Sequence, residues 1–95
     1  MPRMEQWAVT AEPDPFKAPE ARRPCLHGIA YGHHIHADGA RVTTTPIHKV
    51  ERFNGSVLVT TRSGTIYELG TVSPDYEAVY ANAVERLGMV ADGTN

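Results

Sequence analysis

The chain of 95 residues is 41% hydrophobic and 21% charged, with a formal net charge of −2. This length fits one small domain, and the composition is typical of a globular protein. The nearly balanced charge argues against a general nucleic-acid binder, which would carry a clear excess of Lys and Arg on one face. The single cysteine, Cys25, excludes an internal disulfide.

The N-terminal residues predict an edge strand. Trp7, Val9 and Ala11 alternate with polar residues, which is typical of a half-buried strand, here from about Glu5 to Thr10. Trp7 is either a packed residue that closes a small core or, if it is exposed, a binding anchor.

A proline-rich strap follows this strand. Proline is concentrated between Pro13 and Pro24. Because proline fixes φ and removes a backbone donor, the segment is predicted to be an extended connector rather than a strand or helix. Phe16 is expected to hold the strap against the body of the domain, and the alternative is a mobile recognition arm.

The main unit begins with a strand predicted from Cys25 to about His34. Its odd positions, which include Ile29 and Tyr31, are mostly apolar and are expected to face the core. The even positions are small and leave the other face open to a neighbouring backbone or a ligand. Asp38-Gly39 predicts the hairpin turn that follows.

The next strand is predicted from Arg41 to Thr45. Pro46 is expected to end this strand or make it bulge, so Ile47 to Phe53 is treated as a separate strand.

Two short loops then predict a meander. Asn54-Gly55 predicts a type I′ loop that pairs Phe53 with Ser56, Val50 with Val59 and Glu51 with Leu58. Ser63-Gly64 predicts a second two-residue loop, and in this register Thr61 pairs with Ile66 and Thr60 with Tyr67. Val59 and Ile66 would then share one face, and Leu58 and Tyr67 the other. Because both faces are partly apolar, each needs a cover.

The C-terminal part predicts an amphipathic helix. Ser73 is a suitable N-cap and Pro74 suits the first helical position. Gly88 is a suitable residue to end the helix. The residues between them form one apolar stripe at helical spacing: Tyr76, Val79, Tyr80, Ala83, Val84 and Leu87.

Together these elements predict an α+β fold. The expected architecture is a small curled antiparallel β-sheet or open barrel of about five strands with one C-terminal amphipathic helix. Residues 1–24 would form the edge strand and the strap, residues 25–88 the single β-meander and helix domain, and residues 89–95 a flexible tail.

Three clustered histidines, His33, His34 and His36, raise the question of a metal site. His34 and His36 are two residues apart, so on an extended strand they project from the same face. With a third ligand they could hold zinc, which would support a metal-dependent hydrolase. The spacing matches no specific zinc signature, and neither a metal nor another cofactor is the favoured prediction. The alternatives are a strand end that binds nothing and a polar or phosphate-binding site.

Other candidate chemistry is weaker. Thr43, Thr44 and Thr45, with Arg41 and Arg62, could form an anion-binding surface or be ordinary sheet-surface residues. Cys25 fits a reduced, partly buried thiol better than a catalytic nucleophile, because no third group is evident beside His27. The sequence contains no nucleophile elbow, P-loop or dinucleotide fingerprint, so no catalytic residue is assigned.

Several short motifs carry a family resemblance. They are the Gly-x-x-x-Gly-His step at Gly28–His33, Asp38-Gly39, the Thr43–Thr45 run, and Thr-x-Ser-Gly-x-x-Tyr-x-Leu-Gly at Thr61–Gly70. Their order resembles a largely uncharacterised group of small bacteriophage and prophage proteins, over roughly residues 18–70. The chain departs from that pattern at His34-Ile35-His36, where something like Pro-Arg-Phe is expected. A ligand pair at His34 and His36 would therefore be peculiar to this chain.

The resemblance implies no activity but does imply a phage setting, in which small proteins inhibit or redirect host machinery. The leading hypothesis is a non-enzymatic protein that occupies a host factor, such as a bacterial antiviral defence complex, through Trp7, Phe16 or Tyr31. The second is a protein that sequesters a signalling nucleotide, in a pocket of one chain or between two copies. Its predicted lining is His33, His34, Arg41 and threonines such as Thr43 and Thr45. The third is the hydrolase. No apolar run reaches the length of a membrane span, so no membrane partner is expected and the predicted location is the host cytoplasm.

Overall fold

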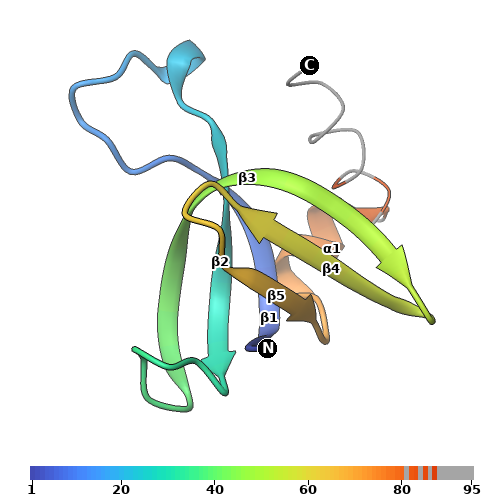
Figure 1. Cartoon of the computed structure of the whole chain (residues 1–95). Coiled ribbons are helices and arrows are strands. Elements are labelled where there is room, and N and C mark those ends of the chain that lie inside the picture. Colours follow the sequence, from blue (N-terminus) through green and yellow to red (C-terminus); the bar gives the residue numbers. More distant parts are fainter. Residues whose placement is uncertain (81, 84, 86, 88–95) are drawn as a thin grey trace.

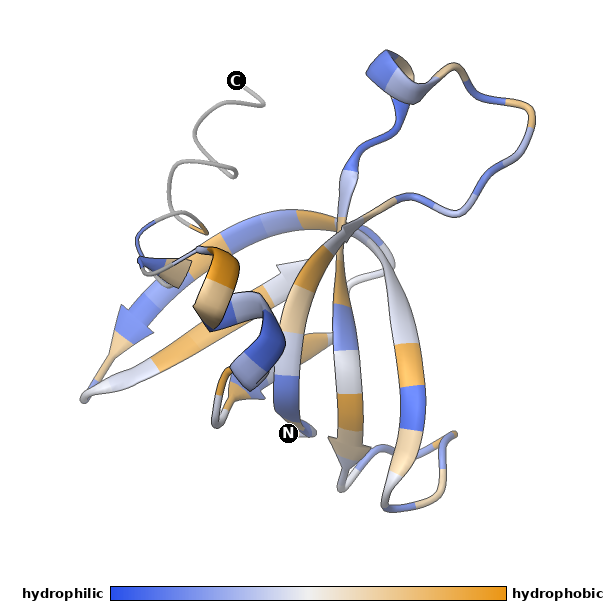
Figure 2. Cartoon of the chain, turned by 180° about the vertical axis from the view of Figure 1, so that it is seen from behind, coloured by the Kyte–Doolittle hydropathy of each residue, from blue (hydrophilic) through white to orange (hydrophobic). Residues whose placement is uncertain are grey.

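The computed structural model describes residues 1–80, 82, 83, 85 and 87. Five strands close into a barrel, and a short helix follows the last strand, with Tyr76 packed against the core (Figures 1 and 2). No helix in these described residues is long and apolar enough to cross a membrane. The elements are β1 (Arg3–Ala11), a 3-10 helix (Pro19–Ala21), β2 (Pro24–Tyr31), β3 (Ala40–Phe53), β4 (Ser56–Thr61), β5 (Ile66–Leu69) and α1 (Pro74–Val79).

The way the barrel closes follows from its strand number. Consecutive strands pair antiparallel in chain order, so the first and the last of five strands run in the same direction. The closing pair β1–β5 is accordingly parallel, with Arg3 opposite Glu68 and Met4 opposite Leu69. The predicted sheet of about five strands is thus confirmed, but it closes into a ring, where a curled sheet or open barrel was predicted. The N-terminal strand, however, is not an edge strand, because it pairs with β2 on one side and β5 on the other.

The strands share one buried core with Ala83 and Leu87 from the C-terminal part of the chain. Trp7 is 1% exposed, and its Nε1–H donates to the carbonyl oxygen of Gly70 at 3.1 Å. This is the packed alternative for Trp7, and it leaves the side chain no surface on which to act as a binding anchor. Alternating hydrophobic and hydrophilic bands along the strands are visible in Figure 2. The buried cluster consists of Met4, Trp7, Leu26, Ala30, Val42, Ile47, Val59, Tyr67, Ala83 and Leu87.

A β-bulge in β1 explains how Trp7 reaches this core. Met4 and Trp7 are three residues apart, so regular alternation would point them to opposite faces. The β1–β2 register shifts between Glu5 and Ala8, and Gln6 has a φ of +47°, in the left-handed region. The extra residue turns both Met4 and Trp7 inward.

The inward face of β2 is opposite to the predicted one. Leu26, Gly28 and Ala30 are buried, whereas Ile29 and Tyr31 are only partly buried. The interior is narrow here, because a Cβ on Gly28 would lie 2.7 Å from the carbonyl oxygen of Glu5 and 2.9 Å from Cγ of Met4. The small residues therefore belong inside the barrel, where Met4 fills the space that they leave.

The prediction of two strands around Pro46 is wrong, although the predicted bulge occurs. β3 is one long, strongly curved strand that passes through Pro46 (Figure 1). The part of β3 up to Pro46 pairs with β2, and the part from Ile47 pairs with β4. Pro46 lacks an N–H, but it lies at a change of partner, and its carbonyl oxygen accepts a hydrogen bond from the N–H of Arg62 at 2.8 Å.

The first predicted hairpin is confirmed in type and register. Asn54 and Gly55 have φ values of +49° and +81°, as a type I′ turn requires, and Phe53 pairs with Ser56.

The register of the second predicted hairpin is wrong by one residue. The N–H of Thr61 bonds to the carbonyl of Thr65, so Arg62, Ser63 and Gly64 form a three-residue loop with Gly64 at φ +92°. Thr60 therefore pairs with Ile66, and Val59 with Tyr67. A shift of one residue exchanges the faces of a strand, so Tyr67 is 3% exposed in the core while Ile66 is 40% exposed.

The helix begins as predicted but is shorter. Ser73 is the N-cap residue and Pro74 the first helical residue, whereas α1 ends at Val79, with Tyr80 as the C-cap. Of the predicted stripe, Tyr76 packs against the core and Ala83 and Leu87 are buried in it, but Val79 is 71% exposed. The predictions for Val84, Gly88 and the tail 89–95 lie outside the described residues.

Candidate functional site

The predicted site residues are partly brought together at one cavity, which we call the His–Thr pocket. Its volume is about 210 Å³. It is formed by the loop after β2, the first half of β3, the turn after β4 and Tyr67 of β5. His33, His36, Thr43 and Thr45 line it, whereas His34, Arg41, Tyr31 and Trp7 do not. Its other lining residues are Ile35, Val42, Thr44, Thr61, Ser63, Thr65 and Tyr67.

Local hydrogen bonds order the histidine loop. The N–H of Gly32 donates to Oδ1 of Asp38 at 2.8 Å, and the N–H of Gly39 donates to the carbonyl of Ala30 at 2.9 Å. Gly39, at φ +87°, closes the turn that Asp38-Gly39 predicts. The histidines therefore follow the strand on a turn, rather than continuing β2 in extended conformation.

His33 is the centre of the histidine cluster. Its ring stacks on His34, with 4.8 Å between the ring centroids, and lies 4.7 Å from His36 and 5.9 Å from Tyr67. Nδ1 of His33 accepts the N–H groups of Ile35 and His36 at 3.0 and 3.4 Å. The neutral ring therefore carries its proton on Nε2. Burial, and then the neighbouring His36 and His34, lower the pKa of His33 below 6.5, so the ring is neutral at pH 7.

This arrangement does not assemble a metal centre. Within residues 1–80, 82, 83, 85 and 87, no three or more His, Cys, Asp or Glu side chains are placed to hold a metal ion. His34 and His36 are both exposed on the turn, and the Nδ1 lone pair of His33 is already used by backbone donors. The histidines therefore offer ring nitrogens to a polar ligand rather than a closed coordination shell.

Hydroxyl groups form the opposite wall of the His–Thr pocket. Oγ1 of Thr45 donates to Oγ of Ser63 at 3.2 Å and accepts the N–H of Ser63 at 3.1 Å. Oγ1 of Thr61 lies 3.1 Å from the same Ser63 oxygen. These hydroxyls hold the turn after β4 against β3, so they fix the shape of the pocket. With no Arg or Lys in its lining, and with a volume below the roughly 300–1,000 Å³ of most ligand sites, the pocket suits a small polar molecule.

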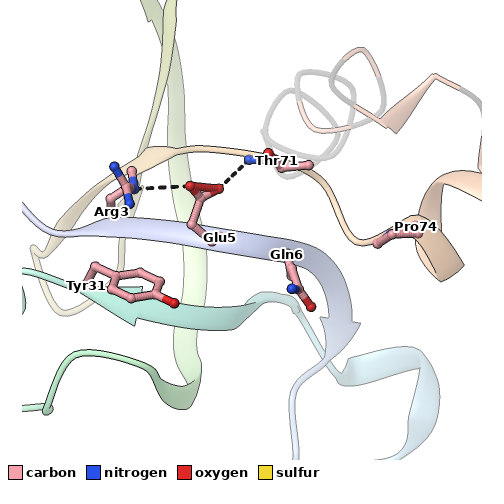
Figure 3. A pocket seen from close by; sticks show the side chains of 6 residues that line it. All are labelled: Arg3, Glu5, Gln6, Tyr31, Thr71 and Pro74. Carbon is pink, nitrogen blue, oxygen red and sulfur yellow. Dashed lines mark hydrogen bonds and ion pairs between the residues drawn. The ribbon is translucent and has the colours of Figure 1, made fainter.

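A larger, open cavity of about 530 Å³ lies on the outside of β1 (Figure 3). Its charges are paired with one another: Nε of Arg3 lies 3.2 Å from Oε2 of Glu5, and Oε1 of Glu5 accepts the N–H of Thr71 at 2.6 Å. The Arg3 guanidinium also lies 5.4 Å from the ring centroid of Tyr31. Tyr31, a predicted contact residue, is therefore engaged by Arg3 and only partly exposed.

Cys25 has the environment of a structural thiol. Its side chain is fully buried, and Sγ contacts the carbonyl oxygen of Arg23 at 3.8 Å. Burial, with a smaller effect of Glu12, raises the pKa of the Cys25 thiol. The neighbouring His27 uses Nδ1 in a 2.8 Å contact with Oγ1 of Thr43, so the pair that a nucleophile would need is not formed.

The strap, residues 12–23, stands out from the barrel as a loop in both overall views (Figures 1 and 2). We call it the projecting loop. At its base, the N–H of Glu12 donates to the carbonyl of Arg23 at 2.9 Å, and Nζ of Lys17 lies 2.8 Å from Oε1 of Glu12. The hydrogen bond from Lys17 is the main reason that the pKa of Glu12 is lowered.

The prediction that Phe16 holds this segment against the barrel is wrong. Phe16 is 97% exposed, and its N–H donates to Oδ1 of Asp14 at 3.0 Å in a local turn. The Glu12–Lys17 pair and the turn at Asp14 hold the loop in place of an aromatic contact. A carboxylate and a lysine on either side of a Pro-Asp-Pro turn are the only sequence signal for this, and it is a weak one.

No family model, curated protein or solved structure matches this chain, so the significance of these sites depends on their geometry.

Proposed function

We propose that this chain is a non-enzymatic binding protein that engages a protein partner through the projecting loop, with Phe16 as the anchor. The observation that carries the proposal is the 97% exposure of Phe16 at a loop whose base is fixed to the barrel. Because the Phe16 ring is outside the core, a partner can bury it without disturbing the fold of this chain. Aromatic residues also dominate the energetics of protein interfaces.

The construction of the loop supports this role. Pro13, Pro15 and Pro19 restrict its backbone, and the Glu12–Lys17 ion pair shortens the free segment. A loop that is ordered before binding loses less conformational entropy when it meets a partner. An exposed aromatic tip that projects from a small barrel is suited to insertion into a pocket on another protein.

The resemblance to phage proteins suggests the kind of partner. A small protein in that setting acts in the cytoplasm of a bacterial host, and the partner would be a host protein such as a component of an antiviral defence complex. Binding by itself accounts for inhibition of this kind, so no catalytic residue is needed.

The test compares three tagged forms of the full chain expressed in a bacterial host: the unaltered protein, Phe16→Ala and Phe53→Ala. Phe53 is a matched control, because it is also a highly exposed phenylalanine, at 66%, but lies beside the Asn54-Gly55 turn. Quantitative mass spectrometry of the co-purified proteins identifies a partner, and calorimetry with that purified partner measures its affinity. Loss of an interface anchor typically costs at least about 2 kcal/mol, so Phe16→Ala should weaken binding at least about thirtyfold while Phe53→Ala has little effect. A partner that binds the Phe16→Ala form as tightly as the unaltered protein would refute the proposal.

A further inference from the structure

A third cavity, of about 330 Å³, lies where the base of the projecting loop meets the bend of β3. We call it the Arg–His pocket; it is lined by Arg23, Pro46, Ile47, His48 and Arg62. Pro46 and Ile47 are buried and form an apolar floor, whereas Arg23, His48 and Arg62 are exposed around it. Three segments that are far apart in the sequence thus bring their basic side chains to one hollow.

The irregular pairing of β3 and β4 places these side chains. Ile47 pairs with Thr61 and Lys49 with Thr60, so His48 is the extra residue of a β-bulge. Bulges re-aim a side chain relative to regular alternation, and here the bulge residue lines the pocket. The N–H of Arg62 bonds to the carbonyl oxygen of Pro46, which fixes the start of the Arg62 side chain beside the bulge. On the other side, the N–H of Glu12 donates to the carbonyl oxygen of Arg23, which fixes the backbone of the second arginine.

The charges of the Arg–His pocket are of one sign. None of its lining residues is acidic. Among the residues that the structure describes, the ion pairs involve Arg3, Lys17 and Lys49, and neither Arg23 nor Arg62. Lys17, which is already paired with Oε1 of Glu12, is the main cause of the lowered pKa of that carboxylate, and the charge of Arg62 is a minor cause. Two guanidinium groups with available N–H donors therefore share a hollow with a histidine ring, which offers an N–H in either tautomer.

We propose that the Arg–His pocket binds a phosphate monoester. Guanidinium groups match the oxygens of a phosphate with paired hydrogen bonds, and a monoester carries a charge of about −1.5 to −2 at pH 7. Such a group would offset the positive charge that Arg23 and Arg62 bring to the pocket, and the apolar floor would contact the first atoms of the esterified group. The phosphate could belong to a free nucleotide or to a phosphorylated side chain, since the same chemistry recognises both.

The experiment is a titration of the ¹⁵N-labelled full chain with inorganic phosphate and with adenosine 5′-monophosphate, at constant ionic strength set with chloride. We expect saturable shifts of the backbone amides of Arg23, His48 and Arg62. A hydrogen bond to a charged group contributes roughly 1.5–3 kcal/mol, so Arg23→Gln and Arg62→Gln should each weaken binding at least about tenfold. Arg52→Gln is the control, because it removes an exposed arginine that lies outside the pocket, and it should change the affinity less than about twofold.

The outcomes separate clearly. Shifts that do not saturate, or an equal loss of affinity in Arg52→Gln, would overturn the proposal by showing general attraction of anions to the surface. Tighter binding of the nucleotide than of inorganic phosphate would support the site and assign it to a nucleotide. Equal binding of the two would support the site and indicate a phosphate presented by a partner. The result does not depend on Phe16, so this proposal and the proposed protein contact can fail separately.

Discussion

Replacing Gln6 with glycine should stabilise the protein. Gln6 adopts φ +47°, where the Cβ of an L-residue approaches the following carbonyl oxygen and costs roughly 1–2 kcal/mol. Glycine avoids this cost but loses roughly 0.5–1 kcal/mol more conformational entropy on folding. The Gln6 side chain is exposed and makes no hydrogen bond among the described residues, so little else is lost. The difference between these two ranges is about 0–1.5 kcal/mol, and the middle of it, roughly 0.5–1 kcal/mol, is the expected net gain.

For a domain of this size, each kcal/mol moves the melting temperature by about 4–8 °C, so Gln6→Gly should melt about 2–8 °C higher in circular dichroism or calorimetry. Gln6→Val is the informative control, because a β-branched residue tolerates the left-handed region poorly and should lower the melting temperature. If both variants have the same melting temperature as the unaltered protein, Gln6 does not occupy a strained bulge. The explanation of how Met4 and Trp7 both face inward must then be abandoned.

Three further predictions follow from the interior and the His–Thr pocket. Gly28→Ala should destabilise the protein by about 1–3 kcal/mol in urea unfolding, because its Cβ would lie 2.7 Å from the carbonyl oxygen of Glu5; an unchanged midpoint would contradict the narrow interior. Because the pKa of His33 is lowered from 6.5 in the folded state, the unfolded chain takes up this proton first as the pH falls. The contribution of His33 to stability is therefore complete above about pH 6.5 and lost as the pH falls through the folded pKa, so His33→Gln should lose less stability than the unaltered protein between pH 7.5 and pH 5. The Cys25 thiol, which is 0% exposed and has a raised pKa, should react with Ellman's reagent at the rate of unfolding, and immediate reaction of the native protein would show that the thiol is accessible.

The parts of the fold that local chemistry determines could be predicted from the sequence. Asn54 and Gly55 both favour positive φ, and a two-residue hairpin loop with two positive φ values is of type I′. The loop length then determines the register of β3 and β4. Pro74 likewise specifies the start of α1, because its fixed φ suits the first helical position, whereas the Ser73 side chain makes no capping hydrogen bond. Neither feature depends on what lies across the barrel.

The parts that depend on distant packing could not be predicted. Ser63-Gly64 suits a two-residue loop and equally a three-residue loop that begins at Arg62, and only the burial of Tyr67 selects the second. The sequence of β2 likewise allows either of its faces to be buried. The face with Gly28 is the buried one because Met4, from another strand, occupies the space beside Gly28. In each case the local pattern allows two faces, and a contact far along the chain decides between them.

The same distinction applies to the candidate sites. His33, His36, Thr43 and Thr45 could be selected as a polar group because they are close in the sequence, and the structure places them around one pocket. The Arg–His pocket could not be predicted, since its basic residues come from three segments and no spacing connects them. Arg62 was expected to act with Arg41, but only Arg62 lines that pocket.

The strand number of the barrel explains why the cavities lie where they do. A closed barrel of five strands has room for little more than its own side chains, and here Trp7, Met4 and Tyr67 fill it. Room for a ligand is therefore left beside this core rather than within it, as at the His–Thr pocket, which Val42 and Tyr67 help to line. The cavity beside β1 lies at the bulge of Gln6, and the Arg–His pocket lies at Pro46 and the bulge of His48. Each of these two bulges thus coincides with a hollow, because a bulge re-aims side chains that regular alternation would direct elsewhere.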